Sequence, residues 1–417
     1  MIDERFLYVD MLKEILNKNE AFSVLKNDIK IKNKSFFNML FMTTFRQLCF
    51  IKKEVLPCFI KKKIPSKQNI LNYILYLGAT ELLFMDSAHY AVINSYVEVA
   101  KKKADKFGAN FVNAVLRNIL RQKDALLANR KTKIFSDNFI KILKKDYNTK
   151  EIEEMEFFAN IEPMLDLSFK PEFKPSFENG YLLDFDTYRL PSNTKITELE
   201  GFNDGMFWAQ DASSSLAVKV LDNIENKKVL DLCAAPGGKT AQLLSKGAIV
   251  TAVDISELRL DILKENIKRL KLEKNLNIVC ADALEFNTDE VFDIILIDAP
   301  CSASGTFRRH PEIIHTKNIK DVDKMANLQE KILEKSINFL KKDGVIIYAT
   351  CSLSKDEGER QILKFIKKYT NFNIIPINIY GTKNMLTKEG FLRILPQNLK
   401  NFSGTDGFFV ACLQRKN

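Results

Sequence analysis

Two cysteines are the strongest candidates for chemistry in this sequence, because each directly follows a short apolar run that predicts a β-strand. Cys301 stands in the string Asp298-Ala-Pro-Cys-Ser, and Cys351 stands in Ala-Thr-Cys-Ser. A thiolate can add to an electrophilic carbon, and cations such as Arg308 and Arg309 can lower the pKa of a thiol or bind a phosphate. A free cysteine is more commonly an inert core residue. The position at strand ends, with the acid Asp298 close by, favours a reactive pair.

A glycine-rich turn marks a second place where a ligand can bind. After another predicted strand the chain reads DLCAAPGGKT at residues 231–240, which predicts a tight turn whose backbone N–H groups can approach a ligand closely. The glycine spacing is neither that of a P-loop nor that of a dinucleotide fingerprint. Asp254 ends the next strand, where it can accept ribose hydroxyls, and Asp282 ends the following one, where it can meet an adenine edge. Each acid alone is more commonly a cap, but together with the turn they predict a nucleoside site.

The elements that must position these residues alternate along the chain from about residue 206 onward. Apolar runs that predict strands, and periodic segments that predict helices, cover residues 229–233, 249–255, 257–270, 277–281, 292–297, 325–340, 345–350 and 408–413. The alternation predicts a doubly wound, Rossmann-like α/β domain with a parallel sheet covered on both faces. Ligands of such sheets bind at the carboxyl ends of the strands. The glycine turn, the acids and both cysteines are therefore expected to share one crevice.

The rest of the chain reads differently. Apolar residues recur at spacings of three and four within residues 68–85 and 109–121, which predicts helices of a small bundle. Residues 141–205 carry four prolines between short strand-like pieces and predict a small mixed α/β linking subdomain. We therefore predict three domains: an all-α domain over residues 1–140, the linking subdomain over 141–205 and the α/β domain over 206–417.

The distribution of charge indicates a polyanionic partner. The whole chain has a net charge of +10, and residues 1–140 hold 24 lysines and arginines against 13 aspartates and glutamates. A basic excess concentrated in one domain is typical of proteins that bind nucleic acid, although a lysine-rich surface can also serve solubility alone. Nucleic acid is the first partner to expect, ahead of an acidic membrane.

Cysteine, histidine and hydropathy patterns argue against several classes of protein. The seven cysteines are scattered without a C-x-x-C pair, so neither a disulfide framework nor a zinc site is expected. Three histidines are too few for a histidine-rich metal centre and speak against a Ser-His-Asp hydrolase. No run of 18 apolar residues occurs, and the first residues lack the cleavage site of a signal peptide. We expect a soluble, cytoplasmic protein that binds no metal.

These motifs resemble those of the RNA 5-methylcytosine methyltransferases, and within them the RsmB (Fmu/Sun) group that acts on 16S ribosomal RNA. The resemblance covers nearly the whole chain. It is carried by the strings WAQDASS (208–214), DLCAAPGGKT (231–240), VDISELRL (253–260), DAPCSASGTFRRHPEI (298–313), ATCS (349–352) and DGFFVACL (406–413). The helical region around NAVLRNILRQ (113–122) is similar to the NusB-like RNA-binding domain that distinguishes this group.

The resemblance implies methyl transfer from S-adenosylmethionine to carbon 5 of a specific cytosine in 16S ribosomal RNA or in a small-subunit assembly intermediate. It makes Cys351 the nucleophile that adds to carbon 6 and Cys301 the assistant in product release, with Asp298 at the ring edge. The residues implied to bind the cofactor are Cys233, Ala234, Ala235, Pro236, Gly237, Gly238, Lys239, Asp254, Arg259, Asp282 and Asp298. We expect the protein to act as a monomer.

The implied chemistry makes further demands on the chain. Carbon 5 of cytosine is a poor nucleophile until a thiolate has added to carbon 6. The target base must also leave its stack, and Phe307 and Phe391 are candidates to replace the lost stacking, although each can equally be a core residue. One departure from the group stands out, because Ile314 and His315 occupy positions where a lysine and an aromatic residue are usual. Contacts of residues 312–316 with the substrate strand are left open by it.

Three other functions are compatible with parts of this pattern. The catalytic motifs do not name the RNA, so a transfer-RNA or another ribosomal-RNA cytosine-5 methyltransferase is an alternative that the NusB-like domain disfavours. DNA cytosine methylation uses a cysteine of the Pro-Cys type as nucleophile, and the additional cysteine of the Thr-Cys type disfavours it. A non-catalytic RNA-binding or assembly factor would have no need of Cys301, Cys351 and Asp298.

Overall fold

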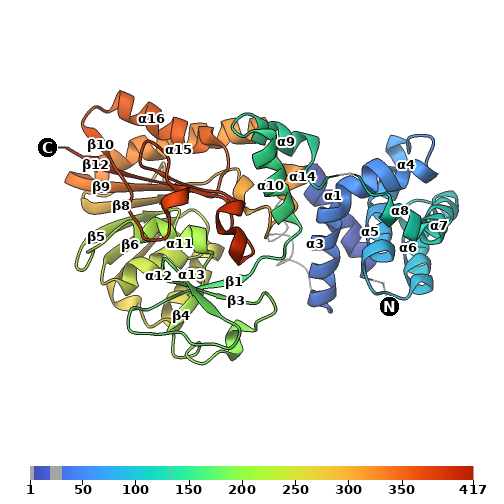
Figure 1. The fold of residues 1–417 in the computed structure, drawn as a ribbon, viewed down its shortest axis with the longest axis horizontal. Helices are drawn as coiled ribbons and strands as arrows, with labels where there is room; N and C mark the ends of the chain where they lie inside the picture. Colours follow the sequence, from blue (N-terminus) through green and yellow to red (C-terminus); the bar gives the residue numbers. More distant parts are fainter. Residues whose placement is uncertain (1–3, 19–30, 132, 417) are drawn as a thin grey trace. The chain divides into compact units, whose positions relative to one another are not determined.

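The computed structural model describes residues 4–18, 31–131 and 133–416, and the chain divides into two compact units. The helical unit comprises the chain up to Lys141 together with Arg309–Asn318, and the sheet unit comprises Ile142–Arg308 and Ile319–Asn417. The predicted all-α and α/β architectures are both confirmed (Figure 1). The domain boundaries at residues 140 and 205 stay predictions, because compactness does not show which segments fold alone.

The helical unit is built around one apolar core. Its helices are α1 (Arg5–Lys18), α3 (Lys34–Phe50), α4 (Leu56–Phe59), α5 (Ile70–Phe84), α6 (His89–Lys103), α7 (Lys106–Arg121), α8 (Lys123–Ala128), the start of α9 (Asp137–Lys144) and the short α14 (Ile313–Thr316). The predicted helices over 68–85 and 109–121 correspond to α5 and α7, which bury Ile74 and Leu116 in this core. Asp105 caps α7 by accepting the Gly108 N–H at 2.6 Å. No helix within the described ranges combines the length and the apolar character needed to span a bilayer.

The segment of residues 309–318 belongs to the helical unit although it follows Cys301 closely in the chain. Ser136 Oγ donates a hydrogen bond to the Ile314 carbonyl, and His315 Nε2 lies 2.6 Å from the Phe45 carbonyl oxygen. The imidazole of His315 also stacks on the Phe45 ring, with the ring centroids 6.5 Å apart. The two residues that depart from the family pattern are therefore held by packing within the helical unit.

Acid is expected to weaken the helical unit through His315. Burial lowers the pKa of His315 to about 4, against about 6.5 for an unperturbed imidazole in the unfolded chain. Between these two pH values the unfolded chain binds a proton that the folded unit does not bind. Stability therefore falls as the pH drops through this window, by up to about 3 kcal/mol in total.

Calorimetric unfolding of the full chain near pH 7 and near pH 4.5 measures this loss, which His315→Gln should remove. The exposed His89 provides the matched control His89→Gln. An equal pH dependence in the two variants would contradict the prediction.

A small antiparallel sheet opens the sheet unit. After α10 (Thr149–Ala159) come β1 (Leu165–Phe169), β2 (Tyr181–Leu183), β3 (Thr187–Leu190) and β4 (Phe207–Ala209), in the order β2-β3-β1-β4. A buried ion pair lies within it, in which Arg189 donates to both carboxylate oxygens of Asp166 at 2.6 and 2.8 Å. The helix α11 (Ala212–Lys219) then leads into the large sheet.

The large sheet has eight strands. They are β5 (Lys228–Leu232), β6 (Ile249–Asp254), β7 (Leu276–Cys280), β8 (Phe292–Asp298), β9 (Leu340–Thr350), β10 (Phe372–Ile375), β11 (Leu392–Ile394) and β12 (Phe408–Arg415). Strands β7-β6-β5-β8-β9 run parallel in that order. Beyond β9 the sheet continues with β12, which is antiparallel to β9, and then with β10, which is antiparallel to β12. The helix predicted over residues 325–340 is α15 (Ile319–Ser336). It ends earlier than predicted because a 3₁₀ turn follows it and Leu340 is already the first residue of β9. The short β10 and β11 were not predicted.

Helices cover both faces of the large sheet (Figure 1). Successive strand residues face opposite ways, so that Val229 joins one apolar cluster and Leu230 the other. The first cluster includes α11, α12 (Gly238–Ser245) and α13 (Glu257–Arg269), and the second includes α15 and α16 (Glu359–Lys368). Burial on both faces explains the continuous apolar runs that predicted these strands.

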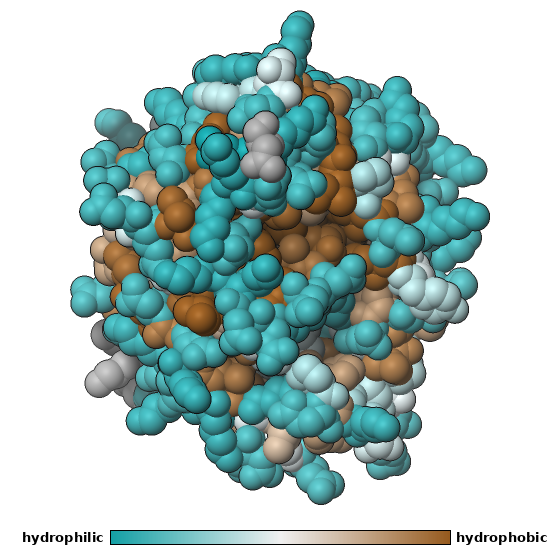
Figure 2. Space-filling view, turned by 90° about the vertical axis from the view of Figure 1, so that its left-hand side faces the viewer, coloured by the Kyte–Doolittle hydropathy of each residue, from teal (hydrophilic) through white to brown (hydrophobic). Residues whose placement is uncertain are grey.

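The amino ends of the parallel strands form the opposite end of the sheet from the predicted site. Figure 2 shows one face of the molecule, with apolar side chains gathered in a central hollow and polar side chains around it. A hollow of about 360 Å³ at the amino ends of β5, β8 and β9 has Leu221, Ile224, Ile294 and Val345 among its lining residues. It lies away from the carboxyl ends, where the candidate residues gather.

Candidate active site

The glycine turn joins β5 to α12 at the carboxyl end of the parallel sheet. Cys233 and Gly237 both have positive φ angles, +62° and +99°. The Ala234 N–H donates to the Val253 carbonyl at 3.1 Å, and the Gly237 N–H donates to the Ala234 carbonyl at 2.9 Å. The N-cap of α12 is Gly237, whose position offers no side-chain cap, so N–H groups at the helix start are open to a ligand. The turn and the first helical residues comprise the predicted cofactor residues Cys233, Ala234, Ala235, Pro236, Gly237, Gly238 and Lys239.

Gly237→Ala is expected to destabilise the sheet unit by about 1 to 3 kcal/mol. The alanine would have to adopt the positive φ of Gly237, and its Cβ would lie 2.8 Å from Leu263 Cγ. Gly238→Ala is the matched control, since its Cβ would meet nothing closer than Gln210 Cδ at 3.6 Å. Thermal unfolding of both variants measures the difference. Equal melting temperatures would show that the conformation of Gly237 does not matter for stability.

Asp254 and Asp282, two of the predicted acids, both lie at the carboxyl ends of strands but make different contacts. Asp254 Oδ2 accepts the Ala235 N–H at 3.1 Å, and its Oδ1 accepts the Ser256 N–H at 3.0 Å. Arg259 Nη1 lies 3.6 Å from Asp254 Oδ2, and the guanidinium also donates to the Ala235 carbonyl. Asp254 and Arg259 are thus bound to the glycine turn. Asp282 follows β7, one strand further along the same edge, where its carboxylate accepts a backbone N–H two residues later at 2.8 Å.

Lys239 forms an ion pair with Asp298. Its Nζ donates to Asp298 Oδ2 at 2.7 Å and to Ser214 Oγ at 2.9 Å. The same ammonium lies 5.1 Å from the centroid of the Phe408 ring. The Lys239 side chain is 8% exposed and that of Asp298 33%, so the carboxylate is the more accessible partner. This pair links the glycine turn to the acid that precedes Cys301.

Asp231 is buried beneath the turn, and Cys233 is half-buried within it. Thr240 Oγ1 donates to Asp231 Oδ2 at 2.6 Å. Burial raises the pKa of Asp231 to about 7 and that of Cys233 to about 12. Cys233 therefore stays a thiol at neutral pH and is unsuited to act as a nucleophile.

Cys301 and Cys351 come together at the ends of two neighbouring strands. The parallel register of β8 and β9 pairs Asp298 with Ala349, so the loops that follow start side by side. We call residues 299–305 the Pro-Cys loop and residues 351–357 the Thr-Cys loop. The two sulfur atoms are 3.3 Å apart.

Gly305 locks the two loops together. Its N–H donates to the Cys351 carbonyl at 2.9 Å, and its carbonyl accepts the Gly407 N–H at 2.8 Å. A Cβ at Gly305 would lie 2.1 Å from the Gly407 oxygen and 2.8 Å from the Cys351 oxygen, so only glycine fits.

The surroundings of Cys301 favour its protonated, thiol form. The hydrogen bond with Cys351 raises the pKa of Cys301 well above that of a free thiol, and burial and the negative charge of Glu357 raise it further.

Arg308 does not have the role expected from the sequence, and Phe307 and Phe391 have the second of the two roles that the sequence left open, that of core residues. Arg308 is 1% exposed and donates to the Phe158 and Ser403 carbonyls, so it supplies no charge to a substrate phosphate or to a thiolate. Phe307 and Phe391 are both fully buried core residues, so neither faces a base taken out of its stack. Across the described ranges, no cluster of three or more histidine, cysteine or acidic side chains is arranged to hold a metal ion.

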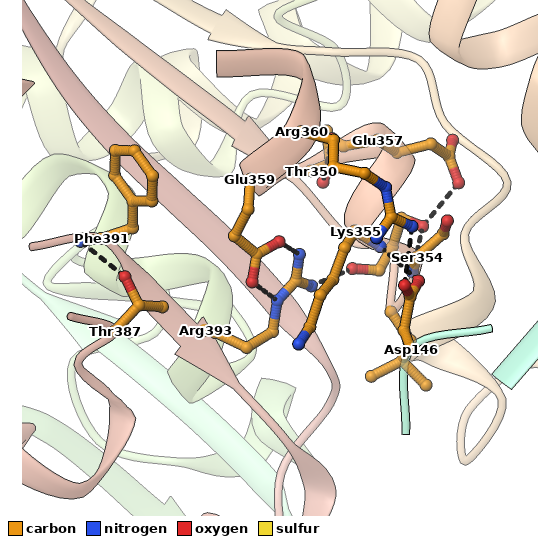
Figure 3. A network of polar contacts seen from close by, with 12 residues as sticks. Asp146, Thr350, Ser354, Lys355, Glu357, Glu359, Arg360, Thr387, Phe391 and Arg393 are labelled. Carbon is orange, nitrogen blue, oxygen red and sulfur yellow. Dashed lines mark hydrogen bonds and ion pairs between the residues drawn. The ribbon is translucent and has the colours of Figure 1, made fainter. Parts of the chain in front are cut away.

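Several residues that support the Thr-Cys loop were not singled out from the sequence. Arg393 donates to both carboxylate oxygens of Glu359, at 3.0 and 2.5 Å, and to the Ser352 carbonyl at 2.5 Å. Asp146 accepts the Arg360 guanidinium at 2.6 Å. Figure 3 shows Asp146, Glu359, Arg360 and Arg393 together with Glu357.

The sequence carries only a weak signal for this support. Residues 355–360 read as a run of charges, which is typical of a solvated helix start. The run comes soon after Cys351, a candidate nucleophile. This closeness in sequence is the one feature that could have indicated a role for its acids at the site.

Comparison with known proteins agrees with this geometry. A family model described as 16S rRNA methyltransferase RsmB/F matches residues 218–414, and a model of the NusB family matches residues 3–121. A crystal structure of the protein PH0851 superposes with a TM-score of 0.75 and 22% identity, covering 98% of this chain and 97% of that one, which shows a shared fold.

Curated relatives extend the match to the whole length. The ribosomal RNA small subunit methyltransferase B of Serratia proteamaculans is 33% identical over 88% of this chain and 89% of its own. The protein of the same name from Yersinia enterocolitica is 30% identical over 99% of this chain and 98% of its own. The predicted resemblance is confirmed, and the chain is a methyltransferase that belongs to the 16S rRNA methyltransferase RsmB/F family.

Proposed function

We propose that this chain transfers the methyl group of S-adenosylmethionine to carbon 5 of a cytosine in 16S ribosomal RNA, with Cys351 as the nucleophile. The observation that carries the proposal is the pair of thiols, 3.3 Å apart at the carboxyl ends of two neighbouring parallel strands. Two adjacent thiols suit a reaction in which one sulfur adds to the ring and must later leave it. The name shared by the relatives, ribosomal RNA small subunit methyltransferase B, points to the RNA.

The glycine turn and the neighbouring acid fit the cofactor. The start of α12, where Gly237 brings no capping side chain, would receive the cofactor carboxylate. Asp254 Oδ1 accepts one backbone N–H, which leaves it a second acceptor position for a ribose hydroxyl, while Oδ2 accepts the Ala235 N–H and faces Arg259. Asp282, one strand away, would meet the adenine edge. When bound, the cofactor supplies an electrophilic methyl group on a sulfonium.

The residues around the thiols can divide the chemistry among them. The Cys351 thiolate forms a bond to carbon 6 of cytosine, and the electron pair of the 5,6 double bond makes carbon 5 nucleophilic. As the thiolate adds, N3 of the ring would take up a proton from water, and Asp298, held by Lys239 at 2.7 Å, would accept a hydrogen bond from the protonated N3. After methylation, water removes the carbon 5 proton, the double bond reforms and the bond from Cys351 to carbon 6 breaks. Cys301, whose sulfur lies 3.3 Å from that of Cys351, would donate its proton to the departing sulfur and regain one from solvent.

The helical unit would hold the RNA. Its part of the sequence carries the basic excess, and the exposed run Lys61 to Lys63 lies in it. A hollow of about 660 Å³ beside this run is lined by Lys52, Lys63, Asn69, Asn72 and Tyr76 among others. The Lys52 ammonium lies 5.0 Å from the centroid of the Tyr76 ring. Cations, amides and a half-buried aromatic ring at the wall of a hollow are groups that can bind phosphates and unstacked bases of RNA.

The decisive experiment is methyl transfer by the purified full chain. The enzyme is incubated with radiolabelled S-adenosylmethionine and either naked 16S ribosomal RNA, small-subunit particles, transfer RNA or DNA, and the products are digested to nucleosides. Label in 5-methylcytidine from the ribosomal substrates supports the proposal. Label only in transfer RNA or DNA, or in another nucleoside, would refute it.

A further inference from the structure

Glu357 is a buried acid whose position is tied to both cysteine loops. It is 0% exposed and lies at the end of the Thr-Cys loop, before α16. Its carboxylate touches neither thiol in the contacts that the structure shows. Instead it binds the residue directly after each cysteine, Ser302 in one loop and Ser352 in the other.

Four donors converge on the two carboxylate oxygens. Oε1 accepts the Ser302 N–H at 2.7 Å and the Gln329 side-chain amide at 3.1 Å. Oε2 accepts the Ser302 hydroxyl at 2.6 Å and the Ser352 hydroxyl at 2.5 Å. A carboxylate offers about four acceptor positions, so its capacity is used in full. Burial raises the pKa of Glu357, and these hydrogen bonds oppose that effect.

The serine hydroxyls extend this junction from one loop to the other. Ser302 Oγ and Ser304 Oγ each lie 3.2 Å from Ser352 Oγ. The Leu353 N–H donates to Ser304 Oγ at 2.9 Å. Gln329, on α15, also donates to the Pro300 carbonyl at 2.8 Å, directly before Cys301. The backbone on both sides of Cys301 and after Cys351 is therefore fixed from one buried centre.

We propose that Glu357 is a positioning residue that sets the distance between the two thiols by binding the residue that follows each cysteine. The inference rests on the proposed function for its catalytic meaning, while its geometric meaning is independent of it. Without the carboxylate, four buried donors lose their acceptor, and the two loops can separate or rotate. Both cysteines would still be present, but the distance between their sulfur atoms would no longer be fixed.

A disulfide probe tests this geometry without any RNA. The azo oxidant diamide takes two electrons and two protons from two thiols, which joins them in a disulfide and leaves the reduced hydrazine. Because the chain has seven cysteines, peptide mass mapping must identify the bridge between Cys301 and Cys351. The rate of that bridge reports how closely the two sulfurs approach each other.

The variants Glu357→Ala and Glu357→Gln, in the full chain, separate loss of the carboxylate from loss of its charge. We expect the alanine variant to form the bridge at least roughly tenfold more slowly than wild type and to lose roughly 100-fold in kcat, with KM for RNA and cofactor unchanged. Glutamine keeps an acceptor for the two N–H donors but not for both hydroxyls, so an intermediate loss is expected. Glu81, another fully buried acid, gives the matched controls Glu81→Ala and Glu81→Gln, which should form the bridge at the wild-type rate.

The outcomes are distinct. A folded Glu357→Ala variant that forms the bridge at the wild-type rate overturns the proposal. A slower bridge with unchanged kcat supports the geometric role of Glu357 and overturns its catalytic meaning. If the alanine variant does not fold, as judged by cofactor affinity, wild-type rates in Glu357→Gln overturn it instead. Should wild-type protein methylate no RNA, the proposed function fails, while the bridge rates alone still decide whether Glu357 positions the thiols.

Discussion

Cys351→Ala is expected to lower methyl transfer on the order of 10⁴-fold or more and to abolish any covalent protein–RNA complex. The substitution removes the sulfur that bonds to carbon 6, and without that bond carbon 5 does not become nucleophilic. The measurement is a denaturing gel that separates radiolabelled RNA from RNA joined to protein, run together with the methyl-transfer assay. Cofactor affinity, measured by calorimetry, should stay at the wild-type level.

Cys301→Ala is expected to fail differently. The substitution leaves Cys351 able to attack. In the wild-type chain the Cys301 sulfur lies only 3.3 Å from the Cys351 sulfur, which must later leave the ring. Without the proton that Cys301 would supply, release of the product slows and the covalent complex with methylated RNA accumulates. Accumulation with Cys351→Ala and not with Cys301→Ala would reverse the two roles. Normal methylation by both variants would mean that the cysteines are core residues and that the mechanism is wrong.

Removing the lysine run of the helical unit is expected to weaken RNA binding and to change its response to salt. Each phosphate contact on single-stranded RNA contributes about 0.7 to the slope of log affinity against log salt concentration. Replacing Lys61, Lys62 and Lys63 by alanine should therefore make that slope shallower by about 2 if all three bind phosphates. Wild-type binding itself should fall by roughly 300-fold between 50 and 200 mM salt if about six phosphates are neutralised.

The matched control removes the same amount of charge from the sheet unit. Lys227, Lys341 and Lys342 line the hollow at the amino ends of the strands, away from the candidate site. Their replacement by alanine should leave both the affinity and the slope close to wild type. Filter binding at several salt concentrations measures all three proteins, and equal slopes for the two triple variants would show that the helical unit does not supply the RNA affinity.

The sheet and the crevice could be predicted because they depend on short stretches of sequence: an apolar run for each strand and the polar residues that follow it. Val229 and Leu230 are buried on opposite faces of one strand, and a strand buried on both faces must be apolar throughout its length. The same rule marked β6 and β8, and the polar residues at their ends could then be assigned to one edge of the sheet. The approach of Cys301 to Cys351 followed from that edge without any knowledge of the loops.

The supporting contacts were not predictable, because they join residues far apart in the chain. Glu357 lies in a run of charges, and nothing local distinguishes an acid that accepts four buried donors from one that faces water. Arg308 shows the reverse error, since a basic residue beside a candidate nucleophile is buried against two backbone carbonyls. Which partner satisfies a buried charge is decided by tertiary structure alone.

The chain enters the helical unit twice, once from its start and once through residues 309–318. A single cut after α9 would therefore leave Ile313 and Ile314 in the second fragment, while Phe45 and Ser136, the residues that bind this segment, would stay in the first. Both isoleucines are buried in the full chain and would face water in such a fragment. Genetic recombination at one point cannot exchange either unit intact, so the two units are expected to have been inherited together as one gene.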